Sequence, residues 1–169
     1  DEVLASLSKN QLTAEQSQLF KRSGGLGQKQ TKKQRLAHEE VMRKFGLAPA
    51  LPDAPAPAAN YVPYVITGNT VYVSGQISQD SNGLITGKLG DDLSVEAGVE
   101  AAKCCALSLL AQVNRACNGD FSRVKAVKLV GFVNSTADFT QQPAVINGAS
   151  DLMVQVLGDA GRHARSAVS

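Results

Sequence analysis

The order of hydrophobic patterns in the later part of the chain constrains its fold more than any other feature. Two stretches rich in Val, Ile and Tyr, at residues 61–67 and 70–77, flank a Gly-Asn pair that is typical of a hairpin turn. Residues 79–90 are glycine-rich and predict a loop with a short strand, and further strand-like stretches cover residues 124–134 and 163–169. Because a helical pattern precedes each of the last two, the order is β-β-α-β-α-β. This order predicts an α+β fold with a mixed sheet and both helices on one face.

Apolar residues at three- and four-residue steps indicate the two helices. Ser94 can cap the first helix, which we expect to run to about Cys117. The second should open with the Gln-Pro pair at residue 142, since proline is tolerated in a first turn, and should end before Gly158. The apolar face of the first helix consists of Val95, Val99, Ala102, Ala106, Leu110 and Val113.

A proline-rich segment divides the chain into parts. Five of the six prolines lie between Pro49 and Pro63, and such a segment adopts an extended backbone without a hydrogen-bonded ladder. We therefore predict a basic helical and flexible extension at residues 1–46, a Pro/Ala-rich linker at 47–60 and one domain at 61–169.

The charges are distributed unevenly between these parts. Residues 1–50 carry nine Lys and Arg against five Asp and Glu, whereas residues 51–169 carry eight against ten. A nucleic-acid-binding domain usually has a basic folded unit, so this distribution argues against nucleic acid as a partner. The basic extension is either a solvated segment or a contact to an anionic partner. No apolar run approaches the roughly 20 residues that a membrane span needs.

The cysteines and histidines suggest neither a disulfide framework nor a metal site. The chain has an odd number of cysteines, Cys104, Cys105 and Cys117, and two of them are adjacent. This pattern favours reduced cysteines in the core. It therefore favours a reducing compartment, either the cytoplasm or a mitochondrion. His38 and His163 are far apart in the sequence and lack a surrounding pattern of metal ligands.

A few polar residues interrupt the apolar segments and are candidates for a site. Ser74 and Gly75 end the second predicted strand, and a glycine there lets a ligand approach the backbone closely. Asn147 lies within the second helix. Arg165 lies in the last strand between small residues, where its guanidinium can bind a carboxylate through two hydrogen bonds. The alternative for Arg165 is an ordinary ion pair or a position at the sheet edge.

Four segments, in this order and spacing, resemble the RidA/YjgF family, formerly called endoribonuclease L-PSP, which has a chorismate-mutase-like fold. They are NYVPYVITGNTVYVSGQI, KLVGFVNSTADF, INGAS and ARSAV, and the resemblance covers about residues 47–169. The GRHARSAV ending and the FTQQPAVINGASDL stretch are most similar to a less-studied branch of the family.

The resemblance implies a homotrimer with a ligand cleft at each subunit interface and no cofactor. It implies hydrolysis of a 2-imino acid or enamine acid to a 2-keto acid and ammonia, as in 2-iminobutanoate/2-iminopropanoate deaminases. By the same resemblance, Arg165 binds the substrate carboxylate, Tyr61 and Ser74 act with it as catalytic residues, and Gly75 and Asn147 bind substrate.

Three features near the C-terminus concern the same site. The chain stops at Ser169 within a predicted strand, so we expect the parent protein to continue, and the family's water-positioning glutamate would lie there. Ala167 stands where the family often has cysteine. His163 lies two residues before Arg165 and should face the same side of the strand, which makes it a further candidate for proton transfer.

These observations leave three hypotheses about function. The first is an imine deaminase of the Rid type. The second is a non-catalytic module of the same fold that binds a small carboxylate or serves as a scaffold, with a protein partner docked through residues 1–46. The third is a ribonuclease, and both the slightly acidic domain and the lack of an aromatic stacking platform argue against it.

Overall fold

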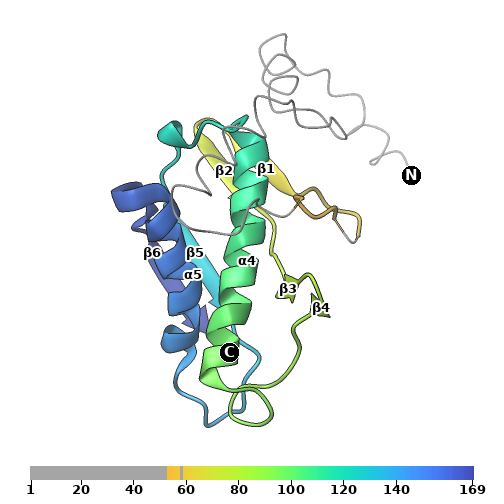
Figure 1. Cartoon of the computed structure of the whole chain (residues 1–169). Coiled ribbons are helices and arrows are strands. Elements are labelled where there is room, and N and C mark those ends of the chain that lie inside the picture. Colours follow the sequence, from red (N-terminus) through yellow and green to blue (C-terminus); the bar gives the residue numbers. More distant parts are fainter. Residues whose placement is uncertain (1–52, 58) are drawn as a thin grey trace, which may run out of the picture.

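The structure, a computed structural model, describes residues 53–57 and 59–169 (Figure 1). The predicted extension at 1–46 and most of the predicted linker therefore lie outside the described residues. The described part contains short strand pairs and two long helices, in the order β1, β2, β3, β4, α4, η1, β5, α5, η2, β6. The predicted alternation of two strands, helix, strand, helix and strand is present, with a small extra hairpin before the first helix.

The first two strands form an antiparallel hairpin. β1 (Tyr64–Thr67) pairs with β2 (Thr70–Val73), and Gly68 adopts a φ of 53° in the predicted turn between them. A left-handed φ of this kind is accessible to glycine at little cost. The next pair, β3 (Gln79–Asp80) and β4 (Gly83–Leu84), is a short hairpin within the predicted loop.

The strands predicted at 61–67 and 70–77 are longer than those observed. Pro63 has no backbone N–H, so it cannot donate to a ladder, and the first strand starts after it. The backbone N–H of Ser74 donates to the Pro63 carbonyl over 2.9 Å, which closes the hairpin. The Gln76 side chain then donates to the carbonyls of Ser74 and Gly75, so local bonds occupy acceptors that a neighbouring strand would use.

Both predicted helices are present with the expected boundaries. α4 (Val95–Ala116) is capped by Ser94, whose Oγ accepts from the Ala97 N–H over 3.2 Å. α5 (Gln142–Leu157) has proline in its first turn. The two helices pack closely because Gly148 of α5 has no side chain, and a Cβ there would collide with the backbone of α4.

The last two strands are parallel. β5 (Lys128–Phe132) pairs with β6 (Ala164–Val168), and α5 connects them. The strand predicted at 124–134 is thus shorter than expected, because η1 (Phe121–Arg123) and irregular chain precede it. Antiparallel and parallel pairing both occur, but within the described residues they form separate two-stranded sheets and not one continuous mixed sheet.

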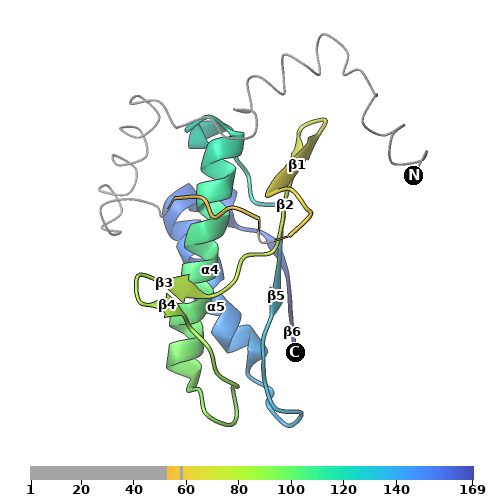
Figure 2. The ribbon, with the colours of Figure 1, turned by 90° about the vertical axis from the view of Figure 1, so that its right-hand side faces the viewer.

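The helices lie on one side of the strands, as predicted. Figure 2 shows α4 and α5 on one side and the β1–β2 and β5–β6 pairs on the other. The core fills the space between them and is made mainly of aliphatic side chains from the two helices. Gly131 of β5 lets Ile146 of α5 pack directly over the strand. The buried core residues are Leu89, Ala102, Ala106, Leu110, Val133, Val145, Ile146, Ala149, Leu152, Met153 and Val156.

Candidate functional site

The alternation of β6 turns Arg165 toward helix α5. Its neighbours Ala164 and Ser166 point the other way, and the Lys128 ammonium of β5 donates to the Ser166 hydroxyl over 2.9 Å on that outer face. Ala167, two residues after Arg165, packs against the core under the helices. Arg165 therefore lies between the parallel strand pair and α5.

Two residues of α5 hold the Arg165 guanidinium. Nη1 donates to the Asn147 Oδ1 over 2.8 Å and to the Ser150 Oγ over 3.2 Å. Asn147 and Ser150 are three residues apart, so they lie on the same face of the helix. Nε and Nη2 make no hydrogen bond to any residue that the structure describes. These two nitrogens form one edge of the guanidinium, which matches the two oxygens of a carboxylate.

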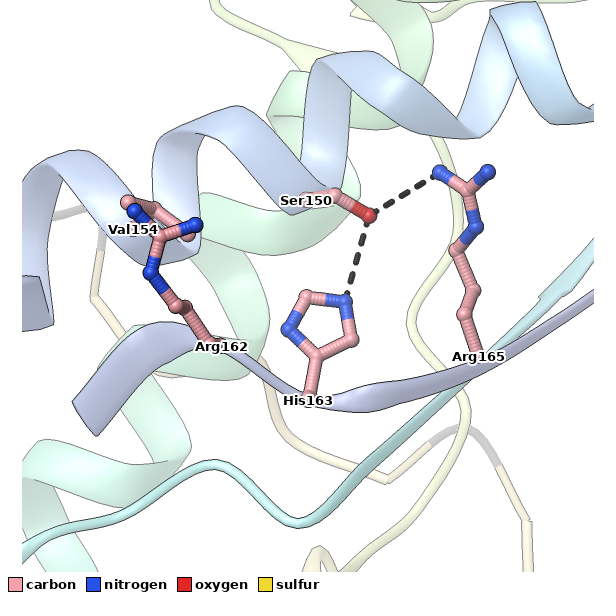
Figure 3. A pocket seen from close by; sticks show the side chains of 5 residues that line it. All are labelled: Ser150, Val154, Arg162, His163 and Arg165. Carbon is pink, nitrogen blue, oxygen red and sulfur yellow. Dashed lines mark hydrogen bonds between the residues drawn. The ribbon is translucent and has the colours of Figure 1, made fainter. Parts of the chain in front are cut away.

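His163 joins the same cluster through Ser150 (Figure 3). The His163 Nε2 lies 3.1 Å from the Ser150 Oγ, and Nδ1 lies 2.6 Å from the Gly161 carbonyl oxygen. A carbonyl can only accept, so Nδ1 carries a proton, and in the neutral ring Nε2 accepts from the Ser150 hydroxyl. In that form of the ring, the hydroxyl accepts from Arg165 and donates to His163. The expectation that His163 and Arg165 share a side is confirmed.

A pocket of about 260 Å³ opens beside this cluster (Figure 3). Pockets that enclose drug-sized ligands usually exceed about 300 Å³, so this one suits a small metabolite. The Arg162 Nε donates to the Asp159 carboxylate over 3.2 Å. The pocket is lined by Ser150, Val154, Arg162, His163 and Arg165.

The structure brings only part of the predicted site together. Arg165 and Asn147 are in contact, as described above. Tyr61, Ser74 and Gly75 do not line the pocket and lie at the open end of the β1–β2 hairpin. There the Ser74 hydroxyl donates to the Val62 carbonyl over 2.6 Å. Within one described chain, these three residues are therefore not neighbours of the Arg165 pocket.

Ser150 and Arg162 are site residues that the sequence patterns did not indicate. A signal for Ser150 exists, because it follows Asn147 by three residues on a helix and must share its face. Arg162 precedes β6 at the end of η2 (Gly158–Gly161), and strand alternation alone would turn it away from Arg165. Because the 3-10 turn precedes the strand, Arg162 does not follow the strand alternation, and both arginines line one pocket.

The cysteines are free thiols, as predicted, but they are half-buried and do not belong to the core. Burial and the neighbouring Cys104 raise the pKa of Cys105 to about 11. Burial likewise raises the pKa of Cys104 and of Cys117. A thiol attacks as its thiolate, so none of the three is activated as a nucleophile near neutral pH.

The described residues show neither a membrane span nor a metal centre. No helix among them is long and apolar enough to cross a bilayer. They also contain no group of three or more His, Cys, Asp and Glu side chains placed to hold a metal ion.

The strand face turned away from the helices carries exposed apolar side chains beside the Lys128–Ser166 pair. The exposed fraction is 62% for Tyr72 of β2 and 81% for Phe132 of β5. Exposed apolar side chains of this size often mark a contact with another protein. We call this strand face the outer apolar face, and it consists of Val65, Tyr72, Val130, Phe132 and Val168.

Comparisons with known proteins give one consistent result. Residues 42–169 match the family model described as "YjgF/chorismate_mutase-like, putative endoribonuclease". Protein TCP17 of Trypanosoma cruzi is 52% identical over 121 residues, which cover 70% of this chain and 75% of that protein.

Two solved structures are also similar. Protein Atu1372 of Agrobacterium tumefaciens, described as having unknown function, is 45% identical, with a TM-score of 0.69 over 81% of this chain and 84% of that one. A "putative endoribonuclease" of Shewanella oneidensis is 35% identical, with a TM-score of 0.71 over 77% of this chain and 85% of that one.

Proposed function

Because the chain belongs to the YjgF/chorismate-mutase-like family, we propose that it hydrolyses small 2-imino acids to 2-keto acids and ammonia. One observation carries the proposal. Arg165 is fixed by Asn147 and Ser150 through a single nitrogen, and its Nε–Nη2 edge makes no hydrogen bond to the part of the chain that the structure describes. A guanidinium held in this way recognises a carboxylate with little loss of conformational freedom on binding.

The chemistry requires one water and one proton path. The substrate carboxylate binds the free edge of Arg165, which fixes the position of the adjacent imine carbon. Water attacks the protonated imine carbon, a C–O bond forms, and the water gives up a proton. The C–N bond of the resulting carbinolamine then breaks, and nitrogen leaves as ammonia while oxygen becomes the keto group. The overall change is imino acid plus water to keto acid plus ammonia.

Ser150 and His163 are the groups we propose for moving that proton. The His163 ring is oriented by the bond of its Nδ1 to the Gly161 carbonyl, and its Nε2 lies 3.1 Å from the Ser150 hydroxyl oxygen. A proton taken up by Ser150 can pass to Nε2, and it can return to the leaving nitrogen by the same path.

The proposal extends to the assembly. The outer apolar face would be covered in a homotrimer, and the trimer would place a cleft between neighbouring copies. Tyr61, Ser74 and Gly75 do not line the pocket of their own chain, and in the proposed trimer they would reach the Arg165 pocket of a second copy. This arrangement would complete the site that the sequence indicates.

A non-catalytic carboxylate-binding module is the second candidate, and the same separation favours it. Arg165, Asn147 and Ser150 form an anion site within one chain, whereas the other predicted catalytic residues lie elsewhere. Ribonuclease activity, which the descriptions of the family model and of the Shewanella oneidensis structure name, has less support. The described domain is slightly acidic, with eight Lys and Arg against ten Asp and Glu in residues 51–169.

An imine-decay assay separates the candidates. An amino-acid oxidase generates 2-iminopropanoate from alanine in situ, and semicarbazide trapping follows its loss with and without the protein. We expect the protein to speed the decay and Arg165→Ala to abolish this effect. Arg123 is an exposed arginine of η1, so Arg123→Ala is the control and should leave the faster decay unchanged. Binding of pyruvate without faster imine decay would support the binding module and refute the deaminase.

A further inference from the structure

The pocket next to Arg165 contains a second guanidinium that the proposed reaction does not use. Figure 3 shows Arg162 and Arg165 rising from the same segment toward α5, with His163 between them. Arg162 and Arg165 line the same pocket, so both side chains border the space that a ligand would occupy. We infer that the ligand carries two anionic groups, and that the substrate class is a short 2-imino dicarboxylate. This inference rests on the proposed function.

The lining of the pocket contains two cationic groups. Of the five residues that line it, two are arginines and none is acidic. A guanidinium forms strong charge-assisted hydrogen bonds with a carboxylate, so this lining can bind a ligand that carries two carboxylates.

The existing partner of Arg162 does not prevent this role. Arg162 and Asp159 form an exposed pair, with 72% and 97% of their side chains accessible. Exposed ion pairs contribute between about 0 and 1 kcal/mol, so a ligand carboxylate can displace Asp159. Nε makes the observed bond, which leaves the Nη nitrogens of Arg162 for the ligand.

The two anchors would have different tasks. Arg165 is fixed by two bonds from α5 and would hold the carboxylate next to the imine carbon. Arg162 is exposed and less constrained, so it would select for the distal carboxylate. Removing Arg162 should therefore reduce discrimination between substrates, whereas removing Arg165 should reduce turnover of all of them.

Two measurements test the inference, one of activity and one of binding. Iminosuccinate and 2-iminopropanoate are generated from aspartate and alanine by the corresponding oxidases, and kcat/KM is measured for each. We expect kcat/KM at least 10-fold higher for iminosuccinate. Arg162→Ala should make the two kcat/KM values equal, and Arg162→Lys should restore part of the preference for iminosuccinate. Asp159→Ala, which frees Arg162, should increase the ratio, and Arg123→Ala should not change it.

The binding measurement does not depend on catalysis. Succinate and propanoate are titrated against the protein by calorimetry or NMR, and succinate should bind at least 10-fold more tightly, with equal affinities in Arg162→Ala. Equal affinities in the unaltered protein, together with equal kcat/KM for the two imines, would overturn the dicarboxylate inference and leave the deaminase standing. Tight succinate binding without hydrolysis of either imine would support the two-arginine site and refute the deaminase.

Discussion

At the scale of single residues, Ser150 links the other polar residues of the site, because it contacts both Arg165 and His163. Its hydroxyl accepts from the Arg165 Nη1 and lies 3.1 Å from the His163 Nε2, so it connects the proposed carboxylate anchor to the proposed proton acceptor. Asn147 holds the same Arg165 nitrogen over 2.8 Å without involving Ser150. Substrate binding and proton transfer can therefore be separated by mutation.

Ser150→Ala should lower kcat by about 10²-fold or more, the usual contribution of general acid–base catalysis, with a much smaller change in KM. Arg165 would keep its Asn147 bond and its free edge, so carboxylate binding should persist. Steady-state kinetics on the imine assay measure both constants. Ser150→Thr keeps a hydroxyl on the same helix face and should recover activity. An unchanged kcat in Ser150→Ala would exclude the relay.

The sequence predicted the charged anchor better than its surroundings. Arg165 and Asn147 were indicated by their positions in apolar segments and by the family resemblance, and they are in contact. Arg162 could not be predicted from strand alternation, because its orientation depends on the 3-10 turn that ends at Gly161. The sequence could not show where Tyr61, Ser74 and Gly75 lie relative to the pocket. The resemblance implies a cleft between subunits, so their positions at the site depend on a second copy of the chain.

At the scale of elements, the helices were easier to predict than the strands. α4 and α5 carry their own boundary signals, a serine cap at one start and proline in the first turn of the other. Strand length depends on partners distant in the sequence, so a Val-rich run cannot show where pairing ends. The close contact of the two helices likewise depends on one residue, Gly148, whose importance is visible only in the packed structure.

Gly148→Ala should destabilise the fold through the contact between α4 and α5. A Cβ at residue 148 would meet the carbonyl of Val99, and backbone cannot move aside as a flexible side chain can. Overpacking of this kind costs typically about 1–3 kcal/mol. Gly75→Ala is the matched control, because a Cβ there would have no atom within 4 Å. Urea unfolding should give a lower midpoint for Gly148→Ala alone, and equal midpoints would contradict the packing argument.

At the scale of the whole molecule, the two faces of the strand layer have different environments. The inner face is covered by α4 and α5 and contributes to the core. The outer apolar face exposes aromatic and branched side chains that a single copy leaves in contact with water. We propose that this face is the contact between identical copies in the homotrimer.

Phe132→Asp should therefore dissociate the proposed homotrimer while the monomer stays folded. Phe132 is 81% exposed in one copy, so the substitution costs the isolated fold little. In the trimer it would place a carboxylate in an apolar contact and remove about 1.5–3 kcal/mol of apolar burial at each interface.

Sedimentation velocity measures the mass and circular dichroism the helix content. Leu84→Asp is the matched control, because Leu84 is 60% exposed on β4, on the helix side of the molecule (Figure 2). It should keep the trimer mass. Loss of imine hydrolysis in Phe132→Asp, with retained succinate binding, would show that the anion site belongs to one chain and the completed catalytic site to the assembly. A Phe132→Asp protein that sediments like the unaltered one would rule out this face as the interface.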